Sequence, residues 1–260
     1  MRLRHVLLLI NQLNQKKMKM NVITSAVLLT LCLSTATDST YAGNNGNTVA
    51  GGSVSGTVKF EGTAPKPRPI NMVADKVCAS QHTSTVFSED AVISSTNTLK
   101  NVFVYIKDFK GTAPAPKGAV SLTQSGCIYK PHVLGLMVGQ KLEITNDDAL
   151  LHNLHGTPSV NKEFNVGQPK KGMKNEFTFD KEEVGIPIKC DVHPWMKSYL
   201  HVLKHPYFAV TDENGKFTIS GVPAGTYTVE AWHEKYGTKT MTIKVTDGGS
   251  AMADFSMSKK

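Results

Sequence analysis

The sequence is poor in the features that mark several large classes of protein. Across 260 residues it has two Trp, 7% aromatic residues and 19% charged residues. No catalytic triad pattern, phosphate-binding loop, H-E-x-x-H or C-x-x-C is present, so the common hydrolase and nucleotide-binding motifs are missing. A c-type haem is excluded as well, because its attachment requires C-x-x-C-H.

The beginning of the chain reads as an export signal that follows an upstream extension. A basic stretch at Met18–Met20 precedes a short apolar run from Val22 to Leu33, and Thr40-Tyr41-Ala42 supplies small residues for cleavage. The apolar run is too short for a comfortable membrane span, although a membrane anchor is the alternative. We expect residues 1–42 to be removed, residues 43–52 to form a flexible tether, and the mature chain to be periplasmic or secreted with no membrane span.

The formal charge of +8 overstates how basic the remaining chain is. Residues 1–42 hold five Lys or Arg and one Asp, so residues 43–260 keep +4. That part of the chain has no run of Lys or Arg, and nucleic-acid binding is therefore not supported.

Three cysteines remain after the leader, and an odd number in an oxidising compartment calls for an explanation. The simplest explanation is one disulfide between Cys78 and Cys127, which leaves Cys190 available for chemistry.

Short alternating segments dominate the rest of the chain and predict an all-β protein. Strand patterns occur at 53–60 and 99–107 and then at short intervals, separated by Gly, Pro, Asn and Asp, with no long amphipathic helix. His205-Pro206 marks a boundary between two predicted sandwiches. The expected units are an N-terminal strand with a Pro-rich segment (53–97), a central domain (98–204) and a C-terminal sandwich (205–260).

The strongest chemical signal is the loop Cys190-Asp191-Val192-His193-Pro194-Trp195-Met196. It places a thiolate, an imidazole and a thioether where one metal ion can reach all three. A type 1 (blue) copper site needs two His and one Cys in a plane, with a weak axial Met. Zinc is the weaker alternative because it favours closed Cys/His sets without Met.

Side-chain alternation on a strand selects the second histidine. His152 shares a face with Leu150 and Leu154, whereas His155 shares the opposite, more polar face with Leu151 and Asn153. We expect His152 to point into the core. His132 and His155 are weaker ligand candidates, and His233 is expected to be a surface residue at a strand end.

These residues resemble the cupredoxin superfamily. The loop C-x-x-H-P-x-M is similar to the ligand loop of amicyanin, and N-x5-H-N is similar to the first-ligand segment of plastocyanins. The resemblance also extends to periplasmic methylamine-utilisation or cupredoxin-like proteins. It implies a cupredoxin-like Greek-key β-sandwich in which His152, Cys190 and His193 are equatorial copper ligands, Met196 is axial, and Asn153 braces the ligand loop.

The C-terminal segment resembles a different family. Residues 214–229 match the G-x-F strand and P-x-G-x-Y pattern of the carboxypeptidase regulatory-like (transthyretin-like) β-sandwich. Such a module usually begins with G-x-V, which Gly56-Thr57-Val58 would supply. The second sandwich is therefore either split around the copper domain or placed simply after it.

The resemblances imply a one-electron carrier rather than an enzyme. The ring edge of His193 is the expected exit for the electron, and Pro194 and Trp195 are the expected surface for a redox partner, such as a c-type cytochrome or a periplasmic dehydrogenase. The alternatives are a copper-binding module without redox duty, such as a chaperone or sensor, and a component of a copper oxidoreductase.

Overall fold

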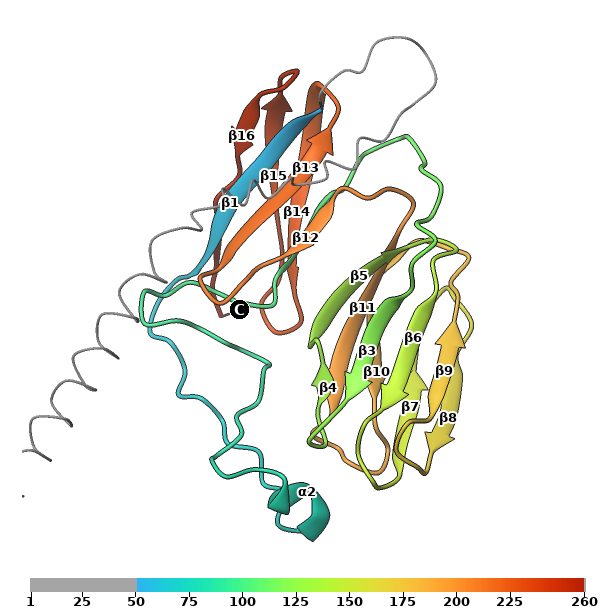
Figure 1. The fold of residues 1–260 in the computed structure, drawn as a ribbon. Coiled ribbons are helices and arrows are strands. Elements are labelled where there is room, and N and C mark those ends of the chain that lie inside the picture. Colours follow the sequence, from blue (N-terminus) through green and yellow to red (C-terminus); the bar gives the residue numbers. More distant parts are fainter. Residues whose placement is uncertain (1–50, 260) are drawn as a thin grey trace, which may run out of the picture. The chain divides into compact units, whose positions relative to one another are not determined.

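The computed structural model describes residues 51–259, and in that range the chain is almost entirely β-structure (Figure 1). The predicted leader (1–42) and most of the predicted tether (43–50) lie outside the described residues. None of the helices in the described part is long and apolar enough to cross a membrane. The expectation of an all-β fold with two sandwiches is confirmed.

One sandwich combines strands from both ends of the described chain. Its first sheet pairs β1 (Gly52–Phe60) antiparallel with β13 (Lys216–Val222) and parallel with β16 (Ser250–Met252) and β17 (Phe255–Met257). Its second sheet has the order β12 (Phe208–Val210), β2 (Phe103–Ile106), β14 (Gly225–His233) and β15 (Gly237–Val245). The two sheets enclose an apolar core that includes Val54, Leu99, Val104, Ile219 and Val229.

The other sandwich is formed by the chain between β2 and β12. One sheet has the order β5 (Val133–Met137), β11 (Lys197–Leu203), β10 (Glu183–Lys189), β7 (His152–Gly156) and β8 (Phe164–Gln168). The other has the order β4 (Tyr129–Lys130), β3 (Val120–Gln124), β6 (Leu142–Asn146) and β9 (Lys174–Phe177). We call this unit the inserted sandwich, because β1 and β2 precede it while their partner strands follow it.

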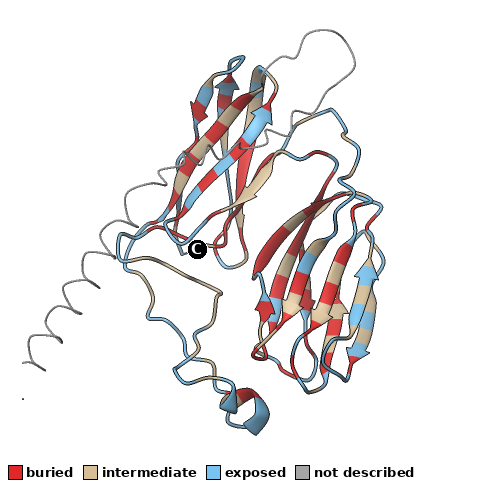
Figure 2. Cartoon of the chain, in the orientation of Figure 1, coloured by how far each residue is buried: buried red, intermediate tan, exposed pale blue. Residues whose placement is uncertain are grey.

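Alternating burial explains why these segments are strands. Along β1 each second residue is buried, so that Val54, Val58 and Phe60 enter the core while Lys59 stays exposed. Figure 2 shows the same alternation along strands of both sandwiches. Gly56 is needed within this strand, because a Cβ there would lie 2.1 Å from the carbonyl oxygen of Ala253. The G-x-V signal thus reflects a close approach between backbones.

β2 lies in a different sandwich from the one expected. The strand pattern at 99–107 predicts a place for this segment in the central domain (98–204). Residues 103–106 pair with β12 and β14, outside the inserted sandwich. Their sequence carries no sign of this, because a short apolar strand fits either core equally well. Phe103 and Tyr105 are buried in a cluster with Val133 and Leu203 of the inserted sandwich.

A segment between β1 and β2 carries the one helix of the described residues, α2 (Lys76–Ser80). The side chain of Asp75 caps it by accepting hydrogen bonds from the backbone N–H groups of Val77 and Cys78. A disulfide joins Cys78 to Cys127, in the loop between β3 and β4, as the cysteine count predicted. The helix is thereby fixed to the inserted sandwich.

Candidate metal centre

The ligand loop predicted from the sequence lies between β10 and β11. These strands form an antiparallel pair in which Lys189 lies opposite Lys197, so residues 190–196 form a closed turn at the end of the pair. The N–H of Cys190 donates to the carbonyl of Met196 (3.2 Å), and the N–H of Met196 donates to the carbonyl of His193 (2.9 Å). The loop therefore has a fixed shape in which Cys190, His193 and Met196 are all buried.

His152 is the first residue of β7, which neighbours β10 in the same sheet. Its side chain is fully buried, as is that of Leu154, whereas Asn153 and His155 lie on the more exposed face. The orientation predicted from alternation is confirmed. The ring of His155 instead contacts Asp191 and Glu163 near the surface.

Three donor atoms meet at this end of the inserted sandwich. His152, Cys190 and His193 each offer one ligand atom within 4.8 Å of the others, and all three residues are buried. The two Nδ1 atoms are 3.1 Å apart, and Cys190 Sγ lies 3.7 Å from His193 Nδ1. Met196, which is 1% exposed, belongs to the same apolar cluster as Cys190. Two further groups with this spacing include Cys78 or Cys127, whose sulfurs are bonded to each other.

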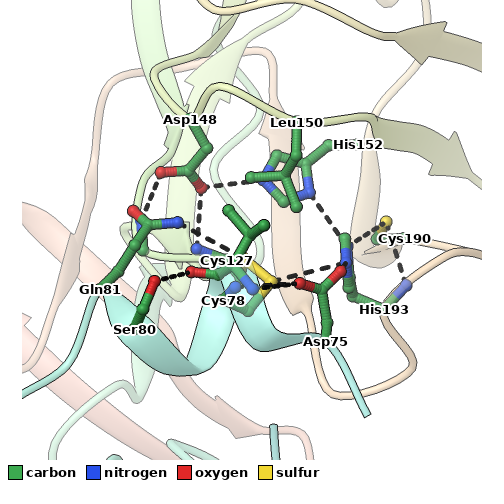
Figure 3. Close-up of a disulfide and its surroundings, with 12 residues drawn as sticks. Asp75, Cys78, Ser80, Gln81, Cys127, Asp148, Leu150, His152, Cys190 and His193 are labelled. Atoms are coloured by element: carbon green, nitrogen blue, oxygen red, sulfur yellow. Dashed lines mark hydrogen bonds and ion pairs between the residues drawn. A yellow bond between two sulfur atoms is a disulfide. The ribbon is translucent and has the colours of Figure 1, made fainter. Parts of the chain in front are cut away.

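Each of the two imidazoles is held by a carboxylate on its outer nitrogen (Figure 3). His152 Nε2 lies 2.8 Å from Asp148 Oδ2, and His193 Nε2 lies 3.2 Å from Asp75 Oδ2. Because an ionised carboxylate only accepts, this pairing places a proton on Nε2 of each ring, so that Nδ1 is the nitrogen left for a metal ion. Two such nitrogens and a thiol sulfur face one another, which is an arrangement that favours a bound cation.

The surroundings also favour the ionised forms of these groups. Burial alone would raise the pKa of Asp148, but hydrogen bonds from His152 and from the backbone of Cys127 and Gly126 hold it below its usual value. Burial would likewise lower the pKa of His152, but its interactions with Asp148 and Cys190 together outweigh burial and raise it, so a metal ion at Nδ1 would displace the second ring proton. The site is therefore built to keep opposite charges together.

Cys190 is prepared to act as a thiolate. Burial would raise its pKa, but hydrogen bonds from His152 and from the backbone N–H groups of Asn153 and His193 lower it. These N–H groups lie 3.3 and 3.4 Å from Sγ. Asn153 has a second contact, because its Oδ1 accepts the N–H of Asp191 at 3.1 Å. This contact ties the start of the loop to β7.

His193 lies deeper than the sequence indicated, and the expected electron exit at its ring edge is not open. The residue is 2% exposed, because Asp75 and Cys78 cover Nε2, with Cys78 Sγ at 3.5 Å. Trp195 is half-buried, its ring centroid lies 5.1 Å from that of His193, and its Nε1 donates to the carbonyl of Cys127. Pro194 is exposed beside it.

The sequence does not identify Asp75 and Asp148 as partners of the two histidines, and the prediction that His233 lies at the surface was wrong. Asp148 lies four residues before His152, but nothing in the sequence separates it from the exposed Asp147 beside it. Asp75 is 118 residues from His193 and reaches it only through the tertiary fold. His233 is 2% exposed rather than on the surface, because its ring stacks on that of Tyr236.

A known family model matches part of one of the two sandwiches. Residues 202–258 match the model of the carboxypeptidase regulatory-like domain, which covers β12 to β17. The sandwich that contains β12 to β17 is therefore of the regulatory-like type. Among curated proteins, none matches the sequence.

Several solved structures resemble part of the chain. A novel purple cupredoxin from Nitrosopumilus maritimus is 26% identical over 32% of this chain and 97% of its own, with a TM-score of 0.28. A single-site mutant of amicyanin in the Cu(I) state is 25% identical over 33% of this chain and 82% of its own, with a TM-score of 0.30. A Cu-containing nitrite reductase from Thermus scotoductus SA-01 is 23% identical over 38% of this chain and 25% of its own, again with a TM-score of 0.30.

These likenesses are too distant to carry an argument about function. The chain is defined instead by its own features: a regulatory-like sandwich, and an inserted sandwich with a buried cluster of one Cys and two His.

Proposed function

We propose that this protein is a one-electron carrier with a single type 1 copper site. His152, Cys190 and His193 would be the equatorial ligands, and Met196 the axial ligand. The observation that carries the proposal is the meeting of two Nδ1 atoms and one thiol sulfur within 4.8 Å in a buried site. A soft thiolate with two imidazoles and a nearby thioether is the donor set that copper takes in blue electron-transfer proteins.

Copper bound here would exchange single electrons, and the protein's part is to keep the ligands still. His152 begins β7, Cys190 directly follows the neighbouring strand β10, and the loop to Met196 is closed by backbone hydrogen bonds. Ligands fixed in this way move little when the metal changes charge. Burial of all three donor residues separates the site from bulk solvent, which supports a carrier rather than an enzyme.

Trp195 and Pro194 are the proposed contact for the redox partner. With the outer edge of His193 covered, Trp195 is the aromatic ring that contacts this ligand and still reaches the surface. A small apolar contact of this kind suits a transient encounter. We propose that the partner is another redox protein, such as a c-type cytochrome or a periplasmic dehydrogenase, and that the protein works in the periplasm or outside the cell.

An absorption spectrum of the copper-loaded chain 43–260 tests the proposal. We expect an intense visible band from thiolate-to-copper charge transfer, and Cys190→Ser should abolish it because an oxygen donor cannot replace the covalent sulfur. His152→Ala should abolish or severely distort the band. His155→Ala is the matched control, since His155 lies three residues along the same strand and contacts Asp191 instead. A colourless wild type, or a coloured Cys190→Ser variant, would falsify the assignment.

A further inference from the structure

Asp75 lies outside both sandwiches, yet its two carboxylate oxygens connect a helix to the metal centre. Oδ1 accepts the N–H groups of Val77 and Cys78, at 2.9 and 3.0 Å, and so caps α2. Oδ2 lies 3.2 Å from His193 Nε2. One side chain therefore fixes the end of the helix and the direction of a ligand ring.

The disulfide fixes Asp75 in this position. Cys78 is three residues after Asp75 and is bonded to Cys127, whose own N–H donates to Asp148 Oδ2 at 2.8 Å. The same oxygen of Asp148 binds His152 Nε2. Asp75, Cys78, Cys127 and Asp148 thus form a continuous chain of contacts from one imidazole to the other, which we call the carboxylate clamp (Figure 3).

The clamp faces both histidines from the side opposite to the donor atoms. A carboxylate on Nε2–H holds the tautomer whose Nδ1 is free to bind a metal, and it makes that nitrogen a stronger donor. A stronger donor stabilises the more highly charged state of the metal. The cover over Nε2 also keeps water from the ring of His193, which is 2% exposed.

We propose that Asp75 is a positioning residue of the metal centre and that the Cys78–Cys127 disulfide holds it there. This inference rests on the proposed copper function. It assigns a role in the metal centre to a segment between β1 and β2 that belongs to neither sandwich. The role of that segment is to orient His193, to lower the reduction potential and to close the site.

The variant Asp75→Asn separates this role from helix capping. Asparagine keeps an oxygen in the place of Oδ1 and is as good a cap as aspartate, so α2 should stay formed. Its amide nitrogen in the place of Oδ2 can only donate, and it cannot accept the proton on His193 Nε2. Glu61→Gln is the matched control, because it removes the same charge from an exposed position in the same segment.

Three measurements decide the matter. In Asp75→Asn we expect a higher reduction potential by voltammetry and a Cu(II) affinity roughly 10- to 100-fold lower in chelator competition. In the copper-free protein, the NMR shifts of the imidazole nitrogens should show that His193 has lost its preference for the proton on Nε2. If Asp75→Asn matches Glu61→Gln in all three, Asp75 is not a positioning residue.

The double variant Cys78→Ser/Cys127→Ser tests the disulfide. It should shift the potential and the affinity in the same direction as Asp75→Asn, because the helix is no longer bonded to the loop. Wild-type values in this variant would overturn the role of the disulfide. A wild type without a blue band would instead refute the copper function, and the imidazole shifts of the copper-free protein would still report on the clamp.

Discussion

At the scale of single residues, Met196 differs from the other proposed ligands because its thioether would be the weak axial donor. It is 1% exposed and closes the ligand loop through its backbone. We predict that Met196→Leu keeps copper bound and keeps the blue band, since the three strong donors remain. Its reduction potential should rise, because the weak axial donor that favours the oxidised metal is gone. Voltammetry of the two proteins checks this, and an unchanged or lower potential would contradict it.

His201 is a buried residue whose charge state is tied to the fold. Its ring stacks on Phe103 with centroids 3.9 Å apart, Nδ1 accepts the N–H of Gly185, and the residue is fully buried. Burial lowers the pKa of His201 from 6.5 to about 3. The unfolded chain therefore binds a proton that the native chain does not, and stability is lost as the pH falls from 6.5 towards 3.

The acid sensitivity due to His201 can be isolated with His201→Leu. Near neutral pH the variant should be less stable by about 1–3 kcal/mol, since the N–H of Gly185 loses its acceptor. Below pH 6.5 this difference in the free energy of unfolding should shrink by up to ~1.4 kcal/mol per pH unit. The reason is that only the wild type must keep a buried histidine uncharged while its unfolded chain binds a proton. Denaturant unfolding at several pH values measures it. Parallel pH curves for the two proteins would show that His201 does not contribute.

At the scale of elements, the loop from Cys190 to Met196 joins the metal centre to the surface through Trp195. We predict that Trp195→Ala slows electron self-exchange of the copper protein, because the ring beside His193 is removed. Trp195→Phe is the matched control, since it keeps an aromatic ring and loses only the hydrogen bond to Cys127. Self-exchange measured by NMR line broadening decides between them. Equal rates in both variants and the wild type would rule out Trp195 as the exit.

β1 is the element that ties the start of the described chain to its end. We predict that a chain beginning at residue 61 has a protease-sensitive segment 202–258, because Val54, Val58 and Phe60 no longer fill the core of the regulatory-like sandwich. Each buried side chain of this size contributes about 1.5–3 kcal/mol. The blue band should persist, since β7 and β10 belong to another sheet. A chain beginning at residue 51 is the control, and protease resistance of both chains would contradict the prediction.

How far the sequence predicts these elements depends on how local the signal is. The loop 190–196 and the inward direction of His152 were predicted correctly, because spacing and alternation are local properties of a strand and its turn. The sheet that contains β2 and the contact of Asp75 with His193 were not predicted. Both depend on pairing between segments more than 100 residues apart, which no short pattern encodes.

At the scale of the whole molecule, the two sandwiches are interleaved along the chain. β1 and β2 come before the inserted sandwich, and their partners β12 to β17 come after it. The segment that bears α2 lies between β1 and β2, so the strand on each side of it belongs to the regulatory-like sandwich. Substitutions that destabilise the regulatory-like sandwich are therefore expected to displace Asp75, although Asp75 contacts His193 of the inserted sandwich.

The interleaved order has a consequence for how the protein is made. As the chain emerges from the ribosome, β1 and β2 are synthesised long before their partner strands. Ser55 cannot pair with Thr218, nor Tyr105 with Glu230, until the later residues have been added. During that interval the inserted sandwich has all of its own strands, whereas β1 and β2 expose unpaired apolar edges. Contacts so distant in sequence form slowly, and exposed edges of this kind are sites of aggregation. A nascent chain of this type is one that a holding chaperone should recognise through β1 and β2 until strands β12 to β17 have been synthesised.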